Sequence, residues 1–116
     1  MPLPDEVRLR HIRDAARDAV KFVEGKLRAD LESNEMLSLA LVRLLEIIGE
    51  AANGISSELR AKHPTIHWAG MTGMRNRLIH GYFDINLDIV WETVIKDLPP
   101  LVAEMELVLR DLPEIK

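Results

Sequence analysis

Hydrophobic and polar positions between residues 5 and 27 recur with the period of an α-helix. Apolar side chains are spaced by three and four, and the opposite face is charged. The pattern predicts a long amphipathic helix over residues 5–27, with a solvated face laced with ion pairs. The apolar stripe is Leu9, Ile12, Ala16, Ala19, Val20, Val23 and Leu27, and the charged face is Arg10, Arg13, Asp14, Arg17, Asp18 and Lys21.

A second helix is predicted from about Ser33 to Ile55, with Ser33 or Asn34 as its N-terminal cap. Its apolar positions cover more than half of its circumference, so it either lies at the centre of a bundle or partly faces a second copy of the chain. Its polar stripe either faces solvent or lines a cleft, with Glu50 as an accessory site residue. The apolar set is Leu37, Leu41, Leu44, Leu45, Ile48, Ala51, Ala52 and Ile55, and the stripe is Arg43, Glu46, Glu50 and Asn53.

Two further helices are predicted in the second half of the chain. A linker at 63–65 precedes a short helix over about 66–81, in which two glycines allow tight packing against another backbone or the approach of a ligand phosphate. A last helix begins after residues 84–86, capped by Asp84 or Asn86, and Pro99-Pro100 predicts a kink or a restart with proline in the first turn. Its inward positions are Ile89, Val90, Val94, Leu98, Leu101, Val102, Met105, Val108 and Leu109.

Composition agrees with an all-α fold, an antiparallel bundle of four to five helices. The 116 residues suit a single domain over 1–116, and 47% hydrophobic residues with only 4% aromatic ones indicate a core of aliphatic side chains. Cysteine is absent, which excludes disulfides and thiolate chemistry. Neither a signal sequence nor a run of about eighteen apolar residues is present. We therefore expect a soluble, cytoplasmic protein without membrane association.

The motif with the most chemical content is RNRLIHGY, at residues 75–82. Arg75 supplies a permanent forked cation that matches two phosphate oxygens, and His80 can exchange a proton near neutral pH. Asn76 is placed to orient His80 or to donate to a phosphate, and Arg77 is an accessory candidate. Because the net charge is −4, these cations are expected to form one local spot that engages one or two phosphates. The simpler alternative is a solvated helix face that His80 caps.

A metal site is not expected. His63 and His67 have the four-residue spacing of metal-binding helical pairs, but Pro64 lies between them. No acidic residue follows His63 as a metalloprotease motif requires.

Residues 75–82 resemble the signature of the HEPN superfamily, specifically of HepT-like toxins from toxin–antitoxin pairs. Further matching positions are 48–52, 68, 71–75, 90–91 and 97–99. The resemblance spans roughly residues 5–112 and implies a HEPN-like helical bundle that forms a two-fold dimer.

The resemblance also implies a function. It indicates a metal-independent endoribonuclease without a cofactor, in which Arg75 and His80, assisted by Asn76, cleave RNA at a composite site between two copies. Tyr82 matches the residue to which the partner antitoxin, a minimal (MNT-type) nucleotidyltransferase, attaches AMP. The alternative from another class is a non-catalytic HEPN helical module that holds a nucleotide or a partner protein at the same spot.

Overall fold

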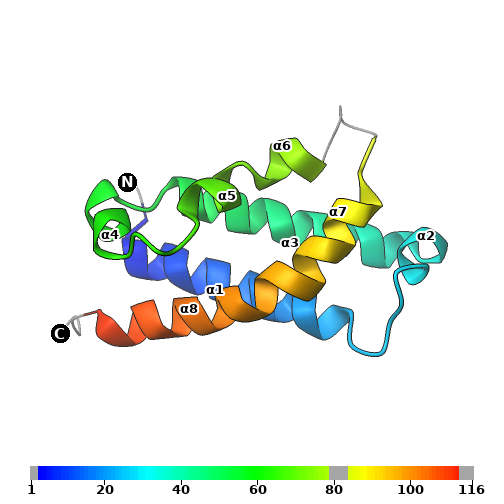
Figure 1. Ribbon diagram of the computed structural model, residues 1–116, viewed down its shortest axis with the longest axis horizontal. Coiled ribbons are helices and arrows are strands. Elements are labelled where there is room, and N and C mark those ends of the chain that lie inside the picture. The colour runs from blue at the N-terminus through cyan, green and yellow to red at the C-terminus, as the bar shows by residue number, and fades with distance from the viewer. Residues whose placement is uncertain (1–2, 79–83, 113–116) are drawn as a thin grey trace.

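The computed structural model describes residues 3–78 and 84–112, and the described chain has the all-α fold that the sequence predicts (Figure 1). Three long helices form the frame: α1 (Asp5–Phe22), α3 (Glu35–Asn53) and α8 (Leu98–Asp111). α1 packs against α3 and α8 and runs antiparallel to both, so α1 begins and α8 ends at the same end of the molecule (Figure 1).

The first helix is shorter than predicted. α1 ends at Phe22, and Val23 is its C-terminal cap. Gly25 adopts a φ of 72°, a left-handed conformation that glycine takes at little cost, and the chain turns there toward α2 (Asp30–Ser33). Leu27, predicted as part of the apolar stripe, therefore lies off the helix and is 71% exposed.

α3 lies between α1 and the segment that forms α5 (Trp68–Thr72) and α6 (Met74–Leu78). It begins at the predicted cap, where the Asn34 side chain accepts a hydrogen bond from a backbone N–H of the first turn at 3.1 Å. One side packs against α1, and another against α5 and α6. This double burial accounts for most of the wide apolar face, but Met36 and Leu39 remain 83% and 52% exposed.

The segment that follows α3 is more broken than predicted. α4 (Ser57–Lys62) is absent from the sequence prediction; the Ser56 hydroxyl caps it and also donates to the Asp5 carboxylate of α1. Gly73 then ends α5, its N–H donating to a carbonyl of that helix at 3.0 Å, and α6 is a separate element. The predicted single helix over 66–81 is therefore wrong, because glycine at this position favours a break.

A close backbone contact holds α5 against α3. A methyl group built on Gly49 would lie 3.0 Å from the Met71 carbonyl oxygen, so the missing side chain lets the two backbones approach. Trp68 anchors the same helix, since it is buried and its Nε1 donates to the His63 carbonyl at 3.0 Å. Together these contacts fix the position of α6, which follows α5 directly.

The last predicted helix begins as expected. The Asn86 side chain caps α7 (Leu87–Glu92) by accepting from a first-turn N–H at 3.2 Å. α7 continues into a π-helical turn, η1 (Thr93–Asp97), and α8 then starts with Pro99 and Pro100 in its first turn. The predicted restart is confirmed, because a first turn tolerates residues without an N–H group.

Replacing Gly49 by Ala is expected to lower the free energy of unfolding by about 1–2 kcal/mol, because the added methyl group over-packs the contact with Met71. Helix propensity alone would shift stability the other way, by about 1 kcal/mol. Urea unfolding followed by circular dichroism measures the change, with Asn53→Ala on an exposed position of the same helix as the control. Unchanged or higher stability of Gly49→Ala would contradict the role of this contact.

Candidate functional site

Arg75 and Glu46 form the centre of the candidate site. Arg75 lies on α6, and its Nε donates to Glu46 Oε2 of α3 at 3.1 Å. The Glu46 side chain is only 20% exposed, whereas that of Arg75 is 60% exposed. Among the described residues, only the Nε edge of the guanidinium is engaged. The pair therefore ties α6 to α3, while most of the Arg75 side chain stays exposed.

An open pocket of about 260 Å³ surrounds this ion pair. Three members of the α3 polar stripe line it, and two of them, Glu50 and Asn53, are also exposed to solvent, so the stripe lines an open cleft and faces solvent at the same time. The lining residues are Glu46, Gly49, Glu50, Asn53, Thr72 and Arg75. Arg43, the remaining member of the stripe, lies beside the pocket with its Nη1 3.7 Å from Glu50 Oε1.

The charges around the pocket cancel, since two arginines pair with two glutamates. The Arg43–Glu50 pair is exposed on both sides, and such pairs contribute only about 0–1 kcal/mol each, so Arg43 can exchange its partner at low cost. A phosphate group is a stronger bidentate partner for a guanidinium than a single carboxylate oxygen. The pocket can therefore accept an anion at the outer edge of Arg75 without unfolding any part of the site.

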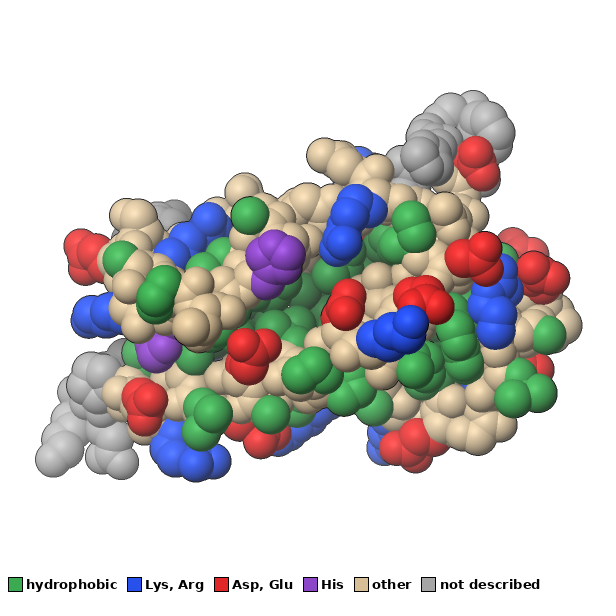
Figure 2. All heavy atoms as spheres, in the orientation of Figure 1, with side chains coloured by type: hydrophobic (Ala, Val, Ile, Leu, Met, Phe, Trp, Pro, Cys, Tyr) green, Lys and Arg blue, Asp and Glu red, His purple; other side chains and the backbone are tan. Residues whose placement is uncertain are grey.

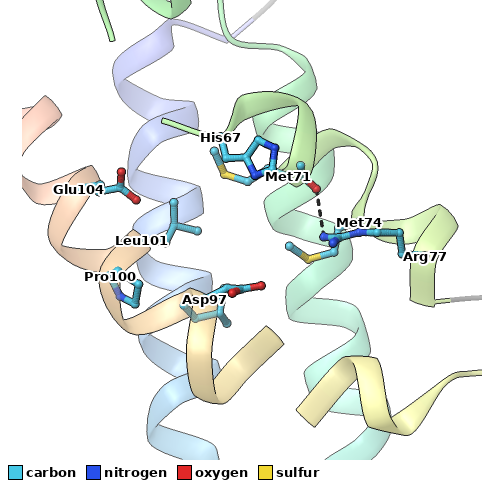
Figure 3. A pocket seen from close by; sticks show the side chains of 10 residues that line it. His67, Met71, Met74, Arg77, Asp97, Pro100, Leu101 and Glu104 are labelled. Carbon is cyan, nitrogen blue, oxygen red and sulfur yellow. Dashed lines mark hydrogen bonds between the residues drawn. The ribbon is translucent and has the colours of Figure 1, made fainter. Parts of the chain in front are cut away.

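Arg77 lies on the other side of α6. Its Nη2 donates to the Gly70 carbonyl at 3.3 Å, and its side chain faces a second hollow, between α5–α6 and η1–α8 (Figure 3). Positions two apart on a helix are about 200° apart around its axis, so Arg75 and Arg77 cannot share a face. The expectation of one positive spot that contains both arginines is therefore wrong.

His80 and Tyr82 lie outside the described residues. The chain on either side of residues 79–83 is held together, because the Leu78 carbonyl accepts a hydrogen bond from the Asn86 N–H at 2.8 Å. This bond joins the end of α6 to the start of α7. Asn76, the predicted assisting residue, is exposed on α6.

Glu46 is the site residue that sequence reasoning did not single out. It stands four positions before Glu50 in the same polar stripe, which is the signal that could have found it. However, 29 positions separate it from Arg75, and their contact depends on how α6 crosses α3. That crossing follows from tertiary packing, which a periodic pattern does not specify.

The two histidines with metal-like spacing belong to different elements. His63 is the C-terminal cap of α4, and His67 precedes α5. Within residues 3–78 and 84–112, no three His, Cys, Asp or Glu side chains are grouped so that they could hold a metal ion. His67 instead lines the hollow that Arg77 faces.

Three similar proteins carry names that describe them as ribonucleases. A protein of Caldanaerobacter subterraneus subsp. tengcongensis named "Putative RNase" is 38% identical over 102 residues, which cover 88% of this chain and 91% of the relative. A Methanocaldococcus jannaschii protein of the same description is 38% identical over 97 residues, covering 84% and 89%. "Probable ribonuclease HepT" of Thermococcus cleftensis is 35% identical over 100 residues, covering 83% and 90%. No solved structure matches the chain significantly.

The family model described as "Ribonuclease HepT-like" matches residues 12–108. This range begins within α1 and ends within α8, so it includes most of the bundle and the pocket around Arg75. The chain belongs to the HepT-like ribonuclease family of the HEPN superfamily.

Proposed function

We propose that this chain is a metal-independent endoribonuclease whose site is completed by a second copy of the chain. The observation that carries the proposal is the arrangement of Arg75, a 60% exposed side chain that Glu46 holds by Nε at the edge of an open pocket. A guanidinium held in this way can use its other edge to bind two oxygens of one phosphate.

The chemistry needs few groups, because RNA carries its own nucleophile. The 2′-hydroxyl attacks the adjacent phosphorus, a base removes its proton, an acid protonates the leaving 5′-oxygen, and a cation stabilises the charge of the transition state. We assign the cation to Arg75 and the proton transfers to His80. Asn76, exposed on α6, assists by donating to a phosphate oxygen. No step requires a metal ion.

Glu46 is a positioning residue in this scheme, and it acts through Arg75. A long, mostly exposed arginine side chain loses rotamer entropy when it must bind in one orientation. The hydrogen bond from Nε to Glu46 fixes that orientation before RNA arrives. Glu50 has an accessory place in the same pocket, where it faces Arg43 rather than Arg75.

A two-fold dimer supplies the second histidine that separate acid and base roles require. Met36 and Leu39, the exposed apolar residues at the start of α3, stand seven positions before Arg43 and Glu46. Residues seven apart lie on nearly the same side of a helix, so this apolar surface continues the stripe that lines the pocket. A second copy that covers it in a self-complementary contact brings its own motif to the same cleft.

Replacing either Arg75 or His80 by Ala is expected to lower RNA cleavage by about 10²- to 10⁴-fold, because each removes a group that acts in the transition state. Cleavage of a fluorescently labelled oligoribonucleotide by purified protein, with and without EDTA, measures the effect. Arg10→Ala is the matched control, since Arg10 is an exposed arginine paired with Glu6 on α1.

Three results would contradict this assignment. They are cleavage that survives both substitutions, strict dependence on an added metal ion, and full activity in a protein that light scattering shows to be monomeric. Expression in bacteria separates the enzyme from a non-catalytic module. Growth arrest that disappears with His80→Ala supports the enzyme, and harmless expression of the unchanged chain supports the module.

Glu46→Ala is expected to lower cleavage by about 10- to 100-fold, the size of effect that a misplaced catalytic group produces. Glu46→Gln retains an acceptor oxygen for Arg75 and should recover part of the activity. Because the loss comes from orientation, kcat should fall more than KM rises. Glu92→Gln, at an exposed glutamate that pairs with Lys96 and lines neither pocket, is the control and should change cleavage less than about twofold. Equal losses for Glu46→Ala and Glu92→Gln would remove the positioning role.

The same proposal makes the protein a cytoplasmic toxin with a protein antitoxin. The antitoxin is a minimal nucleotidyltransferase: the Tyr82 hydroxyl loses its proton and attacks the α-phosphorus of ATP, pyrophosphate leaves, and AMP remains on the oxygen. Tyr82 is close in sequence to Arg75 and His80. The phosphate added to it would bring bulk and negative charge to the site and compete with RNA. None of the described helices is long and apolar enough to cross a membrane.

Co-expression with a nucleotidyltransferase encoded beside this gene is expected to add one or more AMP units to Tyr82 and to abolish RNA cleavage. Mass spectrometry of the digested chain locates the adduct, and Tyr82→Phe is the control that should remain unmodified and active. An adduct at another residue, or equal neutralisation of Tyr82→Phe, would refute the mechanism for this chain.

A further inference from the structure

The hollow that Arg77 faces is separate from the pocket around Arg75. It measures about 230 Å³ and lies between the α5–α6 side and the η1–α8 side of the bundle. Figure 2 shows a depression with a hydrophobic floor whose rim carries His, basic and acidic side chains. The floor is formed by Met71, Met74, Leu98 and Leu101, and the polar rim by His67, Arg77, Asp97 and Glu104.

Local structure holds the rim in place. Gly70 makes room for the His67 ring, since a methyl group there would lie 2.8 Å from Nδ1. The Gly70 carbonyl also accepts the hydrogen bond from Arg77 Nη2, drawn as the dashed line in Figure 3. In the same view, Asp97 and Glu104 face these groups from the opposite wall. One wall is therefore rich in donors, and the other carries carboxylate acceptors.

The size and charge of the hollow limit what it can bind. A cavity of about 150 Å³ holds a benzene molecule, so about 230 Å³ is enough for a bicyclic ring system. In the hollow one arginine faces two carboxylates, which disfavours a phosphate group. The buried methionine side chains of the floor are polarisable and pack well against a flat aromatic ring. A neutral, planar, hydrogen-bonding molecule fits all three properties.

We propose that this hollow binds a guanine base of the RNA substrate. Guanine has two acceptors, O6 and N7, on one edge and the N1–H and N2–H donors on the next edge. Arg77 would donate to O6 and N7, and Asp97 or Glu104 would accept from N1–H and N2–H. Adenine lacks the paired donors, and a pyrimidine has no second ring to cover the floor. The identification of RNA as the ligand rests on the proposed function.

The position of the hollow relative to Arg75 supports this assignment. Arg75 and Arg77 stand on opposite sides of one short helix. A single RNA strand that crosses α6 can therefore place a phosphate at Arg75 and a neighbouring base in the hollow. Base recognition of this kind would make cleavage occur preferentially near guanine.

The test measures base binding apart from cleavage. Full-length His80→Ala protein is titrated with guanosine, inosine and adenosine 5′-monophosphates and with inorganic phosphate, and methyl NMR signals of Met71 and Met74 are followed. We expect the guanosine nucleotide to shift both signals and to bind about tenfold more tightly than the adenosine nucleotide, the discrimination of one bidentate base contact. Inosine monophosphate, which lacks the N2 amino group, should bind with intermediate affinity.

Two variants assign the contacts. Asp97→Asn/Glu104→Gln preserves side-chain volume and should abolish the preference for guanine, as should Arg77→Gln if the double variant fails to fold. Glu106→Gln is the matched control, because Glu106 lies on α8, as Glu104 does, but pairs with Arg17 of α1. Equal binding of the guanosine and adenosine nucleotides, shifts caused by inorganic phosphate alone, or no shift at Met71 and Met74 would overturn the proposal.

A cleavage assay distinguishes guanine binding in the hollow from ribonuclease activity at Arg75 and His80. In the active protein, Asp97→Asn/Glu104→Gln should lose the preference for guanine-containing oligoribonucleotides and keep its rate on guanine-free ones. Guanine binding in a protein that cleaves no RNA would refute the nuclease and leave the base pocket standing. Cleavage that depends on Arg75 and His80 but not on the base would refute the pocket alone.

Discussion

The packing of α5 against α3 at Gly49 sets the geometry of both concave surfaces. Because Gly49 has no side chain, the Met71 carbonyl can approach the α3 backbone closely, and α6 follows directly after the turn at Gly73. That placement brings Arg75 within hydrogen-bonding distance of Glu46. It also directs Arg77 to the opposite side, toward η1 and α8. The wide burial of α3 is therefore both the core of the fold and the support of the candidate site.

The electrostatics of the Arg75 pocket suit a site that is assembled rather than permanently charged. In one copy the arginines around the pocket are matched by glutamates, and the whole chain is acidic. Such a surface attracts RNA weakly at long range, because phosphate binding grows with the number of unmatched cations. This member of the HepT-like ribonuclease family thus combines an acidic chain with a local cationic group at Arg75.

The sequence predicts those parts of the structure that depend on short-range signals. Asn34 and Asn86 cap their helices as expected, and Pro99 and Pro100 mark the start of α8, because capping and proline effects act within one turn. The apolar stripe places Leu27 in the first helix, and this prediction is wrong because a regular stripe hides the stop that Gly25 imposes. The partnership of Arg75 with Glu46 is different in kind. It joins two helices that meet only in the folded bundle. The motif that contains Arg75 could therefore be found from the sequence, but its partner Glu46 could not.

The opposite placement of Arg75 and Arg77 on α6 has a thermodynamic consequence. α6 spans only Met74–Leu78, and its two arginines each make a hydrogen bond to a different neighbouring element. The backbone of this short helix is common to both sides, so any binding free energy that it passes from one arginine to the other has the same size in both directions. A ligand that strengthened binding at one side through the helix would therefore be strengthened equally by a ligand at the other.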